Sequence, residues 1–116
     1  MFKQVGWIVE ARIKPGQRQA FEAVMQELVA ATEQEAGTLN YQYFVSDEGE
    51  VLVYERFADV ASAHTHVSNW DRFAERWVAA AEPTRMVHLG TLPEELRARH
   101  AALSPKYLKP LGGFVR

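Results

Sequence analysis

Polar and apolar residues alternate near the start of the chain, in the segment VGWIVEARIK. A period of two places successive side chains on opposite faces of an extended chain, so residues 5–13 predict a half-buried strand that ends at Pro15-Gly16. Over residues 17–35 the apolar side chains recur at spacings of three and four, without an interior proline or glycine. This pattern predicts an amphipathic helix with Gly37 as its left-handed C-cap.

Two segments rich in β-branched and aromatic residues follow, TLNYQYFVS and VLVYERFA, with residues 47–50 between them as a turn. They predict a β-hairpin. If Ser46 pairs with Val51, the helix-facing positions include Tyr41, Tyr43, Tyr54 and Arg56. The opposite face then carries an apolar patch made of Ile8, Phe44, Val51, Val53 and Phe57. A one-residue bulge would exchange the side chains of the helix-facing side with those of the opposite face.

The second half of the chain predicts another helix, a strand and a short helix. Asp59 is a good N-cap for a helix from Val60, and residues 68–71 form a second cap that opens a helical stretch to about Ala81. Residues 84–90 are strand-like, and residues 91–103 predict a short helix with acidic residues first and basic residues last. The tail of residues 104–116 is rich in proline and glycine, and we expect an extended arm there.

The order β-α-β-β-α-β is that of an α+β, ferredoxin-like sandwich, an antiparallel sheet with helices on one face. A chain of 116 residues without a compositional break is most simply one domain, residues 1–116. The apolar patch predicted on the other face is typical of an interface. A homodimer that stacks two sheets would cover it.

Charge and composition narrow the classes of partner. The net charge is −2, and 13 basic and 15 acidic residues are spread along the chain, which argues against nucleic acid and membrane partners. Cysteine is absent, so disulfides and thiolate metal sites are excluded. The N-terminus lacks the pattern of a signal peptide, and no apolar run approaches the ~18 residues of a membrane span. We therefore expect a cytoplasmic protein.

The segment AHTHVSNWDRFAERW holds the candidate chemistry. On a helix His66 shares one face with Trp70 and Trp77. An imidazole with a pKa near ~6.5, kept neutral by a partly apolar site, suits a general base, although a histidine on such a face is more often a hydrogen-bonded core residue. Asn69 either donates to an oxyanion or caps a helix. The spacing His64-x-His66 does not favour a metal, because helical ligands two apart diverge.

Three motifs, EAGTLNYQYF, VYERFADVASAHTHVSN and KPLGGF, resemble the antibiotic biosynthesis monooxygenase family of dimeric α/β-barrel proteins. The resemblance implies a homodimer whose sheets form a joint barrel, with a pocket between each sheet and its helices. Catalytic members of this family oxygenate hydroxylated aromatics such as quinols and anthrones without flavin, metal or haem. The haem-degrading branch of the family carries an asparagine on its first strand, at a position that falls near Val9 in this chain. This chain has no asparagine there, which disfavours haem chemistry.

The leading hypothesis is a cofactor-independent monooxygenase that oxidises a small hydroxylated aromatic with O₂. His66 is the proposed base, and Asn69 or Tyr54 is the oxyanion donor. The proposed substrate-binding residues are aromatic walls and one cation, namely Trp7, Tyr43, Trp70, Trp77 and Arg56. Two other readings stay open, a non-catalytic ligand-binding or stress-related dimeric module and an isomerase of a small carbonyl compound.

Two placements stay open from the sequence. Arg85 and His88 have opposite parity on the last predicted strand, so at most one of them faces the pocket. The C-terminal arm carries apolar side chains that need burial, and we expect the arm to cross to the partner subunit for this reason. These side chains are Tyr107, Leu108, Leu111 and Phe114.

Overall fold

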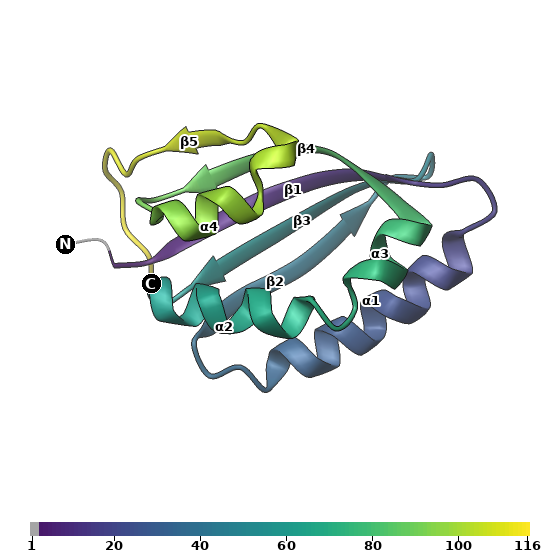
Figure 1. The fold of residues 1–116 in the computed structure, drawn as a ribbon, viewed down its shortest axis with the longest axis horizontal. Coiled ribbons are helices and arrows are strands. Elements are labelled where there is room, and N and C mark those ends of the chain that lie inside the picture. The colour runs from purple at the N-terminus through teal and green to yellow at the C-terminus, as the bar shows by residue number, and fades with distance from the viewer. Residues whose placement is uncertain (1–2) are drawn as a thin grey trace.

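The computed structural model describes residues 3–116, which form a five-stranded sheet with four helices (Figure 1). The strands are β1 (Val5–Ile13), β2 (Thr38–Val45), β3 (Glu50–Phe57), β4 (Ala81–Leu89) and β5 (Lys106–Leu108). The helices are α1 (Arg18–Glu33), α2 (Val60–Trp70), α3 (Ala74–Ala80) and α4 (Glu94–Arg99), followed by the 3₁₀ turn η1 (Ala101–Leu103). None of the helices in this part of the chain is long and apolar enough to cross a membrane.

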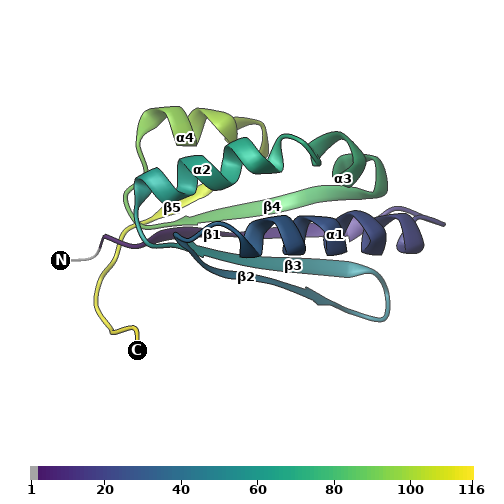
Figure 2. The ribbon, with the colours of Figure 1, turned by 90° about the horizontal axis from the view of Figure 1, so that it is seen from below.

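The strand order is β2-β3-β1-β4-β5, and every pairing is antiparallel except that of β4 with β5. Figure 2 shows α2, α3 and α4 on one side of the strands, with α2 and α4 above β4 and β5. Helix α1 packs on the same face, since Phe21, Val24 and Leu28 share a buried cluster with Val51, Val53 and Trp77. The predicted α+β, ferredoxin-like architecture is therefore confirmed. The other face of the sheet, which we call the open face, carries no helix.

The core follows the two periodicities of the sequence. In α1 the residues at three- and four-residue spacing, Phe21, Val24 and Leu28, are at most 4% exposed. They pack with Val51, Val53 and Trp77 in one buried cluster, and a second cluster lies beneath α2 and α4 around Trp7, Phe57 and Leu96. Because residues two apart share a face, alternate positions of β1 and β3 supply the apolar floor of both clusters.

The predicted hairpin register is wrong by one residue. Val45, not Ser46, pairs with Val51, and Tyr54 therefore lies opposite Gln42. The cause is the turn, since the Ser46 N–H bonds to the Glu50 carbonyl and the Ser46 hydroxyl accepts from the Glu50 N–H. A one-residue shift moves every side chain of a strand to the other face. Tyr54 and Arg56 thus lie on the open face, and their predicted helix-facing positions are wrong.

The same shift changes the membership of the apolar patch. Val51, Val53 and Phe57 are buried beneath the helices, contrary to the prediction. Phe44 and Leu52 stay exposed by 54% and 36% on the open face, directly opposite one another in the ladder. Ile8 and Tyr54 pair next to them. The open face therefore carries an apolar patch that we define as Ile8, Phe44, Leu52 and Tyr54.

The second helical region differs from prediction around its break. The Asp59 carboxylate accepts from the Ser62 N–H at 2.8 Å, which confirms the predicted N-cap of α2. The predicted second cap at residues 68–71 is wrong, because α2 continues to Trp70 and α3 begins after Phe73 without a side-chain cap. Strand β4 starts at Ala81 and includes Pro83, which sits where the ladder with β1 shifts register.

The C-terminal segment adds a strand that the sequence pattern did not reveal. Residues 106–108 pair in parallel with residues 87–89 as β5. Beyond them the chain has no helix or strand, and Leu111 and Phe114 are almost fully exposed, at 102% and 77%.

Gly37 serves a different purpose from the predicted left-handed cap. It is absent from the glycines with positive φ, so no left-handed backbone requires it. A Cβ at Gly37 would lie 1.9 Å from the Ser62 hydroxyl oxygen. The loop between α1 and β2 therefore approaches the first turn of α2 too closely for any side chain.

We predict that Gly37→Ala lowers the free energy of unfolding by about 1–3 kcal/mol, because the added methyl group overpacks this contact. Urea denaturation measures the effect. Gly112→Ala is the matched control, since a Cβ there meets nothing within 4 Å, and we expect its stability to change by less than about 0.5 kcal/mol. Equal midpoints for the two variants would contradict the role assigned to Gly37.

Candidate active site

A cavity of about 160 Å³ lies between the sheet and the helical layer. Its walls are mainly apolar, and they include four large aromatic side chains from β1, β2, α2 and α3, namely Trp7, Tyr43, Trp70 and Trp77. Two titratable side chains, Glu55 and His66, also line it and are almost fully buried. Enclosed apolar cavities with few polar groups are typical of sites for small ligands.

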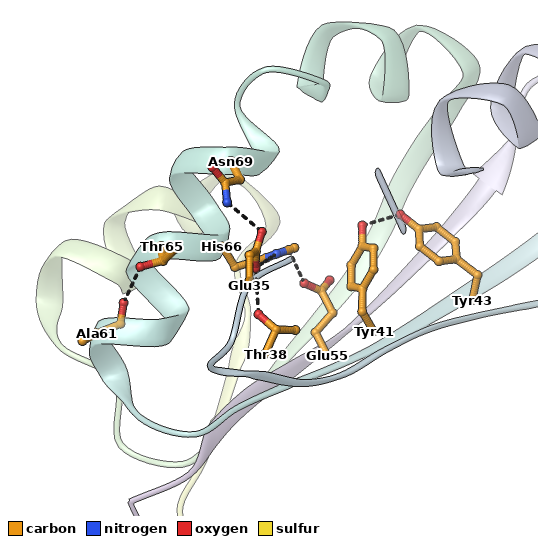
Figure 3. A network of polar contacts seen from close by, with 9 residues as sticks. All are labelled: Glu35, Thr38, Tyr41, Tyr43, Glu55, Ala61, Thr65, His66 and Asn69. Carbon is orange, nitrogen blue, oxygen red and sulfur yellow. Dashed lines mark hydrogen bonds and ion pairs between the residues drawn. The ribbon is translucent and has the colours of Figure 1, made fainter. Parts of the chain in front are cut away.

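His66 sits between two carboxylates, and we call Glu35, His66 and Glu55 the acid–histidine trio. The Nδ1 atom of His66 lies 3.0 Å from Glu35 Oε1, and its Nε2 atom lies 3.0 Å from Glu55 Oε1. The three side chains are 2–8% exposed. Figure 3 shows them in a row, with Glu35 from the loop after α1, His66 from α2 and Glu55 from β3.

Glu35 is held in place by further donors. The Thr38 hydroxyl donates to Oε1 at 2.7 Å, and the Asn69 amide donates to Oε2 at 2.9 Å. With Nδ1 of His66 also on Oε1, both oxygens of Glu35 are engaged. A buried carboxylate held in this way fixes the ring orientation and favours a proton on Nδ1.

The pKa of His66 is raised above its ordinary value. Burial alone lowers this pKa, but the attraction of the imidazolium to the nearby carboxylates of Glu55, and then of Glu35, outweighs burial. The two carboxylates that flank the ring therefore shift its protonation equilibrium toward the charged imidazolium, whereas an apolar site alone would favour the neutral imidazole. The Nε2 atom is at ion-pair distance from Glu55 without the alignment of a hydrogen bond. It remains the ring atom with an unsatisfied hydrogen-bonding position.

A second polar chain lines the neighbouring wall. The hydroxyl oxygens of Tyr41 and Tyr43 lie 2.6 Å apart, and Figure 3 shows the two hydroxyl groups pointing toward one another. Trp77 Nε1 donates to the Tyr43 oxygen at 3.0 Å. The Tyr41 ring packs on His66 with centroids 5.0 Å apart. Burial is the largest cause that raises the pKa of both tyrosines. Both phenols therefore stay uncharged at neutral pH, and Tyr43 presents a hydrogen-bonding group at the cavity wall, with Tyr41 behind it.

The structure brings together most of the side chains singled out from the sequence. His66, Trp7, Tyr43, Trp70 and Trp77 line the cavity. Asn69 lies beside it, but its amide serves Glu35 rather than a helix N-terminus.

Four other predicted positions lie away from the cavity. Tyr54 and Arg56 are on the open face, behind the sheet from the trio. Arg85 pairs with Glu10 there as well. His88 takes the helix-facing position and is buried, yet it contacts His100 at 2.9 Å instead of lining the cavity.

Sequence reasoning missed Glu35, Glu55, Arg99 and His100. Glu55 had a readable signal, because Val51, Val53, Glu55 and Phe57 alternate through β3 and make the glutamate the polar member of a buried face. Glu35 had none, since it lies in the loop after α1 and is buried only by packing against α2. Arg99 and His100 reach the cavity through a short helix whose docking the sequence pattern does not show.

Within residues 3–116 no group of three or more histidine, cysteine, aspartate or glutamate side chains is arranged to hold a metal ion. The trio itself places the imidazole between its two carboxylates. Both ring nitrogens face an acid at 3.0 Å, so the three side chains do not converge on a shared point.

Comparisons with known proteins agree with this architecture. The family model described as antibiotic biosynthesis monooxygenase matches residues 5–76. MupZ from Pseudomonas fluorescens superposes with a TM-score of 0.83 at 20% identity, covering 98% of this chain and 95% of MupZ. No curated protein sequence matches the chain at a significant level.

Two shorter structures are also similar. SnoaB from Streptomyces nogalater, a cofactor-independent oxygenase, gives a TM-score of 0.66 at 11% identity, over 77% of this chain and 93% of SnoaB. PA3566 from Pseudomonas aeruginosa gives a TM-score of 0.64 at 25% identity, over 78% of this chain and 96% of PA3566. At these identities the likeness establishes the fold.

We predict that Glu55→Gln lowers the pKa of His66 relative to the parent chain, because the neutral amide no longer attracts the imidazolium. The pKa of His66 is higher in the folded chain than in the unfolded chain. The protonated ring therefore contributes fully to stability at a pH below its unfolded pKa of about 6.5, and this contribution is lost as the pH rises through the folded pKa. The stability difference between parent and Glu55→Gln should therefore shrink as pH rises through that range.

NMR titration of the His66 ring protons measures the pKa, and urea denaturation at several pH values measures the stability. Glu27→Gln is the control, since Glu27 pairs with Arg76 at the surface and lies outside the trio. A His66 pKa that is the same in Glu55→Gln and Glu27→Gln would contradict the electrostatic role of Glu55.

Proposed function

The chain belongs to the antibiotic biosynthesis monooxygenase family, and from this premise we propose that it oxygenates a small hydroxylated aromatic with O₂ and without a cofactor. The observation that carries the proposal is the acid–histidine trio, which is buried at an aromatic-walled cavity. Such a site supplies a proton acceptor, a compensating charge and an environment that excludes water. These are the needs of a reaction in which the substrate itself provides the electrons.

The first step is removal of the hydroxyl proton. Glu55 and His66 both line the cavity and act together as the acceptor, because Glu55 Oε1 and His66 Nε2 lie 3.0 Å apart and a proton taken up by one side chain is within reach of the other. The positive charge on the imidazole stabilises the phenolate that forms. Glu35, Thr38 and Asn69 hold the ring in place. Asn69 is therefore a positioning residue in this proposal instead of an oxyanion donor.

The second step transfers electrons to oxygen. The phenolate passes one electron to O₂, and the radical pair combines at a ring carbon to give a peroxide. Collapse of the peroxide leaves a carbonyl at that carbon and releases the second oxygen atom as water. The ring carbon thus exchanges hydrogen for oxygen, the hydroxyl loses its hydrogen, and phenol plus O₂ becomes quinone plus water.

The size of the cavity limits the substrate. A dry cavity of about 150 Å³ accommodates benzene in a well-studied protein, and this one measures about 160 Å³. It therefore encloses one aromatic ring, while substituents or a second ring extend toward the opening. This favours a one- or two-ring quinol over a three-ring, anthrone-like substrate.

We predict that Glu55→Gln lowers kcat for O₂-dependent quinone formation by roughly 10²–10⁴-fold, the range for loss of a general base. An oxygen electrode and a panel of one- and two-ring quinols measure the rate. Tyr54→Phe is the matched control, since Tyr54 lies on the open face, and it should retain activity within about twofold.

Three other outcomes would contradict the proposal. Equal rates for Glu55→Gln and the parent would remove the base from the mechanism. Anaerobic conversion of a carbonyl substrate would indicate an isomerase. Thermal stabilisation by quinols without O₂ uptake would indicate a ligand-binding module.

The open face supports a homodimer as part of this proposal. The apolar patch of the open face leaves Phe44 and Leu52 in contact with solvent, and a second sheet stacked on it would bury them. The C-terminal residues Leu111 and Phe114 are exposed in the single chain and gain burial if the arm crosses to the partner. We therefore propose a symmetric dimer formed by the sheet faces and the C-terminal arms.

We predict that Phe44→Glu converts this dimer to a monomer, because a carboxylate placed at a stacked sheet interface loses its hydration. Sedimentation velocity measures the molecular mass. Val78→Glu is the control, since Val78 is similarly exposed, at 40% against 54%, but lies on α3. A Phe44→Glu variant that sediments like Val78→Glu would contradict the proposed interface.

A further inference from the structure

The roof of the cavity comes from a part of the chain beyond the family match. That match ends at residue 76, whereas Arg99, His100 and Leu103 line the cavity from α4 and η1. We call residues 94–103 the C-terminal roof. Figure 1 shows α4 lying by β4 and β1, and Figure 2 shows it on the same side of the sheet as α2. The matched residues of this chain therefore hold the acid–histidine trio, and the roof adds Arg99 and His100 to the wall.

The charges around the cavity are separated. Glu55 and His66 are 8% and 2% exposed and mark the inner end. Arg99 is 42% exposed and marks the outer end, and it is the only arginine or lysine among the lining residues that the structure describes. His100 adds no charge, because burial, followed by His88 and the nearby cations, lowers its pKa to about 4. A ligand thus meets a proton acceptor inside and a fixed cation outside.

Arg99 is held by a partner that a ligand can replace. Its guanidinium donates to both carboxylate oxygens of Asp71, at the corner between α2 and α3, and one of these contacts measures 3.1 Å. Asp71 is 48% exposed, so water already competes with the pair. Exposed ion pairs contribute little to stability. If the carboxylate of a ligand takes the place of Asp71 on the Arg99 guanidinium, the planar two-point geometry that arginine prefers is kept.

We propose that Arg99 binds a carboxylate of the substrate and thereby selects hydroxylated aromatic acids of one or two rings. The acid group takes the place of Asp71 at the outer end, the ring lies among the tryptophans, and the hydroxyl group meets Glu55 and His66. This inference rests on the proposed function only for the chemistry at the hydroxyl group. Selection of an acid by Arg99 is a binding property and is measurable without turnover.

Isothermal titration calorimetry with 6-hydroxy-2-naphthoate and 2-naphthol tests the inference, because the two compounds differ only by the carboxylate. The parent chain should bind the acid at least about tenfold more tightly, which corresponds to about 1.4 kcal/mol. Arg99→Ala should abolish this preference and leave 2-naphthol binding within about twofold. Asp71→Asn should tighten binding of the acid, because it removes the carboxylate that competes for Arg99.

Two further variants keep the test decisive. Arg76→Ala is the matched control, since Arg76 is an exposed arginine paired with Glu27, and it should retain the full preference. Arg99→Lys keeps the charge without the two-point geometry and should retain part of it. If Arg99→Ala unfolds, the opposite shifts expected for Arg99→Lys and Asp71→Asn still decide the matter.

The inference is overturned if Arg99→Ala keeps the preference of the parent chain, or if the parent binds both compounds equally. Absence of binding for both compounds at millimolar concentration also overturns it. Its failure is distinguishable from failure of the proposed function. If the chain binds the acid selectively but shows no O₂ uptake, the acid-binding role of Arg99 stands and the proposed oxygenase activity is refuted. If it shows O₂ uptake without a preference for the acid, the oxygenase activity stands and the role of Arg99 is refuted.

Discussion

The burial of two carboxylates around one imidazole is the constraint on which the rest of the structure depends. Ionised groups are costly to remove from water unless they are paired and hydrogen-bonded. Here Glu35, His66 and Glu55 come from a loop, a helix and a strand, so each pairing also fixes the position of one element relative to another. The loop after α1 must approach α2 closely, which explains why position 37 carries no side chain.

The same arrangement separates the cavity into chemically different ends. The sheet contributes Glu55 and an apolar floor, α2 contributes His66, and the rings of Trp70 and Trp77 pack edge to face with centroids 6.4 Å apart. Tyr43 is fixed by Trp77, so this wall needs no reorganisation when a ligand enters. A site held in this way spends little binding energy on ordering its own side chains.

Periodicity alone predicted the layers, because buried faces of helices and strands repeat at fixed intervals. It placed His66, Trp70 and Trp77 on one helix face, and all three line the cavity, although Trp70 is only partly buried and Trp77 lies on the separate helix α3. It failed where hydrogen bonds of a turn decide the register, and Tyr54 and Arg56 therefore exchanged faces with Glu55. It also gave no sign of Glu35, whose burial arises from contact between distant segments. The protonation preference of His66 followed from these unseen partners.

The short parallel strand at the edge of the sheet has a mechanical consequence. Tyr107 in β5 packs on His88 with ring centroids 5.2 Å apart, and His88 in turn touches His100 at the cavity. Arg97 lies over the same tyrosine ring at 4.5 Å. Strand β5 has only three residues, so the stiffness of the cavity roof is limited by this short ladder. Detachment of the tail would therefore loosen the roof and widen the opening of the cavity, while the floor formed by the sheet kept its shape.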